Sequence, residues 1–324
     1  MNSFGRIFRI SIFGESHGKS IGIIIDGCPP GINFTEESML SDISRRKSGS
    51  KGTTPRNEAD IPNIISGVFN GKTTGAPISI IFKNQNIRSK DYSFVKDTPR
   101  PGHADFVAEK KYKGFQDYRG GGHFSGRLTL ALVAAGVLAK KIIYPLNPVA
   151  KILEVGGFSD IEKGIEYAIK HNDSIGGIVE CMVSNMIPGL GEPFFDSLES
   201  YISHLVFSIP AIKGIEFGSG FSNAKMFGSQ ANDIFIDEKG TTATNNNGGI
   251  NGGISNGNEL VFRIAVKPTS SISKSQETYN FRSKQIEKLN IKGRHDLCIA
   301  LRVPPVLEAV TAIALADLML IDNG

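Results

Sequence analysis

The sequence has no tryptophan and only three cysteines among its 324 residues. Cys28, Cys181 and Cys298 are odd in number and far apart, so neither a metal-ligand spacing nor a disulfide framework can be built from them. This usage favours a reducing compartment. The first residues run straight into a strand-like pattern without signal or transit character, so we expect a cytoplasmic protein.

The sequence also lacks a hydrophobic run long enough to span a membrane, and it lacks a cluster of basic residues. The longest largely apolar runs, 128–139 and 309–316, are too short to cross a bilayer, so no membrane partner is expected. The net charge of +4 is mild, which argues against nucleic acid as a partner and suits small anionic ligands. With 40% apolar and 21% charged residues, the composition is that of an ordinary globular protein.

Helices and strands mix without a regular βαβ rhythm, an internal repeat or a Pro/Ser-rich linker. We therefore predict one α+β domain over residues 1–324. Alternating apolar residues predict strands at 8–12, 21–25, 77–82 and 260–266. Periodicity and capping signals predict helices at 36–46, 128–141, 198–206 and 305–321. Asp196 and Glu199 have the spacing of a capping box, and the small residues of 128–141 imply close approach of a neighbouring element.

The stretch from Arg100 to Thr129 concentrates histidines, arginines and glycines. A triple glycine at 120–122 lets backbone amides approach a ligand and tolerates positive φ. Guanidinium groups beside such a loop suit phosphates and carboxylates, because they donate bidentately and stay charged. A lone triple glycine is usually a surface turn, but here cationic side chains flank it on both sides, which favours an anion-handling active site. These side chains are Arg100, His103, Arg119, His123 and Arg127.

Residues 14–20, GESHGKS, nearly imitate a phosphate-binding P-loop. That motif needs four residues between its glycines and a helix directly after it, whereas here three residues intervene and a strand follows. A P-loop NTPase is therefore a minor alternative, as is a non-catalytic anion-binding protein. His17 lies between glycines at a strand–turn–strand tip, where little core is available to satisfy an imidazole. The Asn- and Gly-rich segment 245–258 is interpreted as an ordered ligand loop.

Seven short motifs occur together in this chain. They are GESHG at 14–18, RPGHAD at 100–105, DYRGGG at 117–122, GLGEP at 189–193, GGISNG at 252–257, KPTSSI at 267–272 and GRHDLC at 293–298. With these motifs in register from about Phe4 to Leu320, the sequence resembles the chorismate synthase family. The resemblance implies a single-domain β-α-β sandwich with antiparallel sheets and outer helices, usually assembled as a homotetramer.

The resemblance also implies a reaction. It is the anti-1,4-elimination of phosphate from 5-enolpyruvylshikimate 3-phosphate to give chorismate, which requires reduced FMN although there is no net redox change. His17 would protonate the departing phosphate, and His103 would protonate the reduced flavin. Asp296 would help to deprotonate flavin N5, the group that takes the C6 proton. Histidine suits such roles because it titrates near neutrality.

Ligand-binding positions follow from the same resemblance, and no metal site is expected. The FMN positions are His123, Phe124, Ser125, Pro210, Ala211, Gly252, Lys267, Pro268, Thr269, Ser270, Ser271 and Arg294. The candidates for binding substrate anions are Arg45, Arg46, Lys51, Arg100 and Arg127.

Two features depart from the family pattern. Around residues 50–52 the chain is one residue shorter than relatives with a second arginine, which is often assigned to a pyridine-nucleotide (NADP) or substrate site. Lys51 is the candidate replacement. At His123 and Phe124 many relatives have Arg-Ser. No dinucleotide fingerprint indicates how FMN is reduced.

Overall fold

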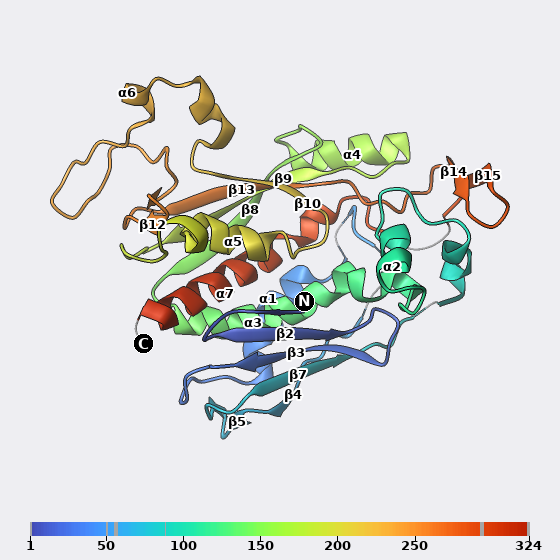
Figure 1. Ribbon diagram of the computed structural model, residues 1–324, viewed down its shortest axis with the longest axis horizontal. Coiled ribbons are helices and arrows are strands. Elements are labelled where there is room, and N and C mark those ends of the chain that lie inside the picture. Colours follow the sequence, from blue (N-terminus) through green and yellow to red (C-terminus); the bar gives the residue numbers. More distant parts are fainter. Residues whose placement is uncertain (1, 50, 55–57, 88, 292–294, 323–324) are drawn as a thin grey trace.

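The computed structural model describes residues 2–49, 51–54, 58–87, 89–291 and 295–322. Two antiparallel sheets enclose a layer of helices (Figure 1). This arrangement confirms the predicted α+β class and the β-α-β sandwich. The main helices lie between the sheets, and α4 (Ile161–His171) lies on the outer face beside β8 (Asn147–Val155).

The first sheet is built from the N-terminal part of the chain. Its strand order is β1 (Ser3–Phe4), β2 (Arg9–Gly14), β3 (Ser20–Asp26), β7 (Ile78–Lys83) and β4 (Asn63–Ser66). Every pair of neighbours is antiparallel. The predicted strands at 8–12, 21–25 and 77–82 are confirmed. Ile21, Ile23 and Ile25 are fully buried because this face of β3 lies against the helical layer.

The second sheet is built from the later part of the chain. Its order is β10 (Ile212–Phe217), β13 (Leu260–Val266), β9 (Gly177–Ser184) and β8. The alternation predicted for 260–266 is confirmed, because every second side chain of β13 is buried. Three small ribbons pair β5 (Val68–Phe69) with β6 (Lys72–Thr73), β11 (Ile250–Asn251) with β12 (Ile254–Ser255), and β14 (Gln276–Asn280) with β15 (Gln285–Leu289).

The central layer holds the long helices. They are α1 (Glu36–Arg46), α3 (Thr129–Ile142), α5 (Leu198–Val206) and α7 (Pro304–Asp322). Shorter helices and turns are α2 (Asp105–Lys111), α6 (Gly228–Ala231), η1 (Ser89–Lys96), η2 (Arg119–Phe124), η3 (Gly126–Leu128), η4 (Phe194–Asp196), η5 (Gly220–Lys225) and η6 (Ile299–Arg302). The close approach predicted from the small residues of α3 is confirmed, since a Cβ atom on Gly136 would lie 2.5 Å from Cα of Ala309 on α7.

Helix α7 is longer than the apolar run 309–316 counted from the sequence. Its 19 residues and mean hydropathy of 1.7 would suffice for a membrane span by length and composition. However, 78% of that window is buried inside the protein, as for a core helix. The expectation that this segment is too short to span is therefore wrong for the whole helix.

The capping box predicted from Asp196 and Glu199 is wrong. Helix α5 begins at Leu198, and its N-cap is Ser197, whose Oγ accepts from the backbone N–H of Ser200 over 3.1 Å. Asp196 instead accepts from Nη2 of Arg6 over 2.7 Å. The hydroxyl of Ser197 is one residue closer to the first turn, so it takes the capping position.

Candidate active site

A cavity of about 780 Å³ gathers most of the predicted site residues. This volume is within the range of small-molecule sites in proteins. The predicted residues that line it are Arg46, Arg100, His103, His123, Phe124, Ser125, Arg127, Pro210, Ala211, Lys267, Pro268, Thr269, Ser270, Ser271 and Asp296. Segments far apart in the sequence therefore meet at one site.

Some predicted residues lie elsewhere. Arg45 donates to Glu308, and Lys51 pairs with Glu166 over 2.9 Å between two exposed side chains. Gly252 is in the turn between β11 and β12, where an added Cβ atom would meet nothing within 4 Å. None of these three predicted positions lines the cavity within the part of the chain that the structure describes. The segment 245–258, predicted to be a ligand loop, contains the β11–β12 ribbon, and none of its residues lines the cavity.

His17 is buried directly behind the glycine loop. It is 4% exposed and lies edge-on to Tyr92, with ring centroids 5.3 Å apart. Gly120, which lines the cavity, has φ +60°, and a Cβ atom there would be 2.5 Å from Nε2 of His17. Only glycine lets the imidazole come this close to the cavity wall. The predicted Arg294 lies outside the described residues.

His103 and Arg100 share the carboxylate of Asp105. Nδ1 of His103 lies 2.7 Å from Oδ1 of Asp105, and Arg100 donates from Nε and Nη2 over 2.7 and 2.8 Å. Burial opposes ionisation of Asp105, but hydrogen bonds from Arg100 and His103 outweigh it and hold the pKa of this carboxyl well below its usual range. Nη2 of Arg100 also lies 3.1 Å from Nδ1 of His103, but the contact with Asp105 is shorter, and an ionised carboxylate only accepts. Nδ1 of His103 therefore donates to Asp105, which leaves Nε2 to exchange a proton with a ligand.

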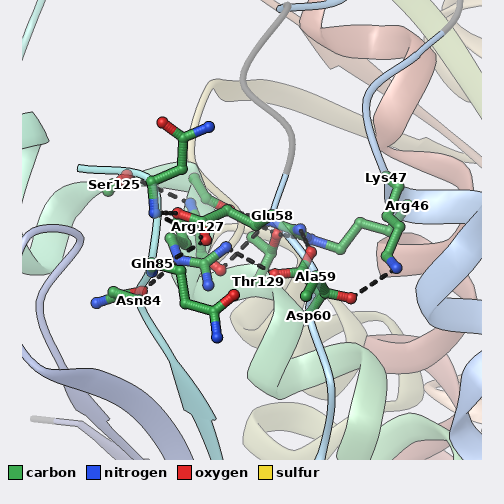
Figure 2. Close-up of polar contacts among 12 residues, drawn as sticks. Arg46, Lys47, Glu58, Ala59, Asp60, Asn84, Gln85, Ser125, Arg127 and Thr129 are labelled. Atoms are coloured by element: carbon green, nitrogen blue, oxygen red, sulfur yellow. Dashed lines mark hydrogen bonds and ion pairs between the residues drawn. The ribbon is translucent and has the colours of Figure 1, made fainter. Parts of the chain in front are cut away.

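Arg127 enters the cavity from the turn before α3. Its Nε donates to Oδ1 of Asn84 over 2.6 Å, and its Nη1 donates to Oδ1 of Asp60 over 2.8 Å (Figure 2). Asn84 in turn donates from Nδ2 to the backbone oxygens of Glu15 and Gly18, 3.0 and 2.9 Å away. The amide of Asn84 therefore joins this arginine to the turn that carries His17.

Arg46 is the most deeply buried cation at the cavity. Its Nε donates to Oγ1 of Thr129 over 2.9 Å, and its Nη2 donates to the backbone oxygen of Gly126 over 2.8 Å. Burial, followed by the charges of Arg302 and Arg127, lowers the pKa of Arg46 to about 9. A further positive charge is costly here, so the region favours an anionic ligand.

Asp296 is held by two groups at the cavity wall. Its Oδ1 accepts from the backbone N–H of Thr54 over 2.9 Å, and its Oδ2 lies 3.3 Å from Nη1 of Arg302. Sequence reasoning missed Arg302 and Asp60, and both line the cavity. Each stands alone among residues without a distinctive motif, so only its packing reveals it.

The loop 267–271, which is predicted to bind FMN, contacts the segment that carries His103. Nζ of Lys267 donates to the backbone oxygen of Gly102 over 2.6 Å and to Oγ of Ser270 over 3.0 Å. Burial, with a smaller effect from the charge of Lys213, lowers the pKa of Lys267. The approach of two ammonium groups at this end of the cavity suits a second anion.

His123 is fixed by protein oxygens on both ring nitrogens. Nδ1 lies 2.8 Å from the backbone oxygen of Gly14, and Nε2 lies 3.1 Å from Oδ1 of Asn2.

Gly14 ends strand β2 and pairs with Ile21 of β3. The segment 14–20 therefore connects two strands, so the helix that a P-loop requires is not there.

The comparisons with known proteins identify the family of the chain. The family model described as chorismate synthase matches residues 8–320. A chorismate synthase from Chitinophaga pinensis is 64% identical over 324 residues, covering 100% of this chain and 98% of that protein. One from Dehalococcoides mccartyi is 44% identical over 351 residues, covering 98% and 96%.

A solved chorismate synthase structure is similar to this chain in fold. The structure titled "Crystal Structure of Chorismate Synthase" superposes with a TM-score of 0.77 at 26% identity, covering 99% of this chain and 94% of that one. The alternatives of a P-loop NTPase and of a non-catalytic anion-binding protein have no support. The chain belongs to the chorismate synthase family.

Proposed function

We propose that this cavity binds 5-enolpyruvylshikimate 3-phosphate together with reduced FMN and that its side chains catalyse the anti-1,4-elimination of phosphate. As a member of its family the chain is a lyase of the shikimate pathway, which leads to the aromatic amino acids. One observation carries the assignment of the site. The imidazole of His103, the carboxylate of Asp296 and the guanidinium of Arg127 all line one cavity of about 780 Å³.

The cavity fits a flavin phosphate by its donor set. Oγ1 of Thr269 is buried and has no hydrogen-bond partner within the described residues, so it is open to a ligand. Lys267 and Lys213 supply positive charge beside it, and Phe124 supplies a partly exposed ring for a flat heterocycle. When bound, reduced FMN would supply an electron-rich ring and the acceptor of the C6 proton. Gly252, which does not line the cavity, and Arg294, which lies outside the described residues, remain predicted contacts.

The side chains at the cavity bind the substrate and transfer protons. Arg127 and Arg46 bind substrate oxyanions, because guanidiniums stay charged in this buried setting. His17 lies behind Gly120 and donates a proton to the departing phosphate. His103, oriented by Asp105, holds a proton at Nε2 toward the cofactor site. Asp296, fixed by the amide of Thr54, accepts a proton.

We also propose a homotetramer in the cytoplasm. The segment 219–244, which contains α6, projects from the sandwich (Figure 1) and exposes large apolar side chains. These are Phe221, Phe227, Ile234, Phe235 and Ile236, all at least 63% exposed. A second copy of the chain would cover them.

The three cysteines are free and buried, which agrees with a reducing compartment. Sedimentation of the wild type and of a Phe227→Asp, Phe235→Asp variant would test the assembly.

The deciding experiment is an anaerobic assay with photoreduced FMN and 5-enolpyruvylshikimate 3-phosphate. We expect chorismate and inorganic phosphate in equal amounts. Binding of FMN, followed by its fluorescence, provides a readout that is independent of turnover. Turnover with oxidised FMN in the presence of oxygen and without a reductant would overturn the mechanism. Tight FMN binding without any chorismate would overturn the assignment of the catalytic residues.

A further inference from the structure

Asp60 is a buried carboxylate between two arginines of the cavity. It is 5% exposed, its Oδ1 accepts from Nη1 of Arg127 over 2.8 Å, and its Oδ2 lies 3.9 Å from Nη1 of Arg46 (Figure 2). Its φ is +50°, in the left-handed region that non-glycine residues seldom occupy. A short polar side chain tolerates this conformation best, and the conformation directs the carboxylate toward both guanidiniums.

The hydrogen bonds of Arg127 leave one of its three guanidinium nitrogen atoms without an acceptor. Nε is taken by Asn84 and Nη1 by Asp60, whereas Nη2 is buried and has no partner within the described residues. The residue is only 8% exposed and lines the cavity. A buried guanidinium N–H without an acceptor is costly, and an oxyanion in the cavity would satisfy it. Asn84 and Asp60 thus hold Nε and Nη1 of the guanidinium and leave Nη2 for a ligand.

We infer that Asp60 is a positioning residue, which fixes the guanidinium of Arg127 so that Nη2 meets a phosphate or carboxylate oxygen of the substrate. This inference rests on the proposed substrate site. Asp60 acts through Arg127 and does not touch the substrate itself. Its carboxylate also lies near Arg46, which donates to the backbone oxygens of Gly126 and Arg127 over 2.8 and 3.2 Å. The carboxylate of Asp60 therefore accepts from the side chain of Arg127 and also lies near Arg46, which donates to the backbone oxygen of Arg127.

Electrostatics and positioning predict opposite results when the charge of Asp60 is removed. If Asp60 only reduces the positive potential of the cavity, removal of its negative charge makes the cavity more cationic, and the anionic substrate binds more tightly. If Asp60 positions Arg127, the guanidinium loses its fixed orientation and the substrate binds more weakly. A small displacement of such a group can cost about 10²-fold in rate. The sign of the change therefore separates the two roles.

The test variant is Asp60→Asn, because asparagine keeps the shape and tolerates positive φ. We expect kcat/KM for 5-enolpyruvylshikimate 3-phosphate to fall by about 10²-fold, with KM raised and the thermal unfolding midpoint within a few degrees of wild type. An unchanged or lower KM would overturn the inference. Asp60→Glu, which keeps the carboxylate, should lose less than Asp60→Asn. Equilibrium binding of the substrate to the FMN-free protein provides a second measurement of affinity.

A double-mutant cycle with Arg127 separates this inference from the proposed site. In an Arg127→Ala background, Asp60→Asn should have no further effect on KM, since the group that it positions is gone. A full additional loss would show that Asp60 acts independently of Arg127 and would overturn the inference. If Arg127→Ala itself leaves KM unchanged, the substrate site is wrong instead. Glu216→Gln is the matched control, because it breaks the 3.2 Å pair with Arg263 away from the cavity.

Discussion

Arg45 on α1 donates two hydrogen bonds, each 2.7 Å long, to the two carboxylate oxygens of Glu308 on α7. Nζ of Lys140 on α3 donates to the same carboxylate over 2.9 Å, and so does the backbone N–H of Ala150 over 3.1 Å. Glu308 is 2% exposed. An arginine expected at the substrate thus joins helices of the central layer, and a buried carboxylate neutralises it.

The first prediction concerns the stability that Glu308 provides. Burial opposes its ionisation, but the hydrogen bond from Arg45 and the charge of Lys140 outweigh burial and lower the pKa of Glu308. A carboxyl with a lowered folded pKa stabilises the fold above its unfolded pKa, and this contribution is lost as pH falls through the folded pKa. The unfolded pKa of glutamate is about 4.3. Below it, we expect the wild-type free energy of unfolding to decline more steeply than that of Glu308→Gln.

Urea unfolding across the acidic range measures this difference. At pH 7, Glu308→Gln should lose about 2 kcal/mol or more, because the partners of the carboxylate are left without their anion. Glu166→Gln is the control, since its pair with Lys51 is exposed and should contribute less than about 1 kcal/mol. Parallel pH curves for wild type and Glu308→Gln would contradict the assignment.

The second prediction concerns the imidazole that Asp105 orients. Asp105→Asn replaces an obligatory acceptor with an amide, so Nδ1 of His103 no longer has a partner that keeps its proton there. We expect kcat to fall by about 10²-fold or more, as for His103→Ala, without loss of the folded state. The double variant should lose little beyond His103→Ala alone. Steady-state rates with saturating substrate and reduced FMN give the comparison, and a loss of only a few-fold would assign both residues to structure.

The third prediction concerns the space that Gly120 leaves for His17. Gly120→Ala should displace the imidazole and lower kcat by about 10²-fold, close to the effect of His17→Ala. Gly157→Ala is the matched control, because Gly157 also has positive φ, at +84°, but an added Cβ atom meets nothing within 4 Å. The control should lose stability but keep its kcat. Equal loss of activity in both variants would point to backbone strain alone.

The fourth prediction concerns Lys51. If it replaces the loop arginine of relatives, Lys51→Ala raises KM more than it lowers kcat, which is the signature of lost uniform binding. Its exposed pair with Glu166 leads us to expect a KM within about two-fold of wild type. A tenfold increase in KM would show that the loop reaches the substrate during turnover. Lys163→Ala, on the helix α4 that carries Glu166, serves as the control.

The sequence alone determined the elements that depend on local pattern. The alternation of Leu260 and Phe262 placed β13, and Thr35 marked the start of α1, because strand period and helix capping act over a few residues. The glycine run at 120–122 and the cations that flank it also predicted anion chemistry, since glycine freedom and fixed charge belong to the residues themselves.

Only the tertiary structure decided which charges face the cavity. Arg45 and Arg46 are neighbours, but successive helical residues point about 100° apart, so one meets Glu308 while the other lines the cavity. Asp60 meets Arg127, 67 residues away in sequence, and no motif marks either contact. Such pairs form because the two sheets close around α3 and α7. The position of each side chain then depends on packing between distant segments, which no local period encodes.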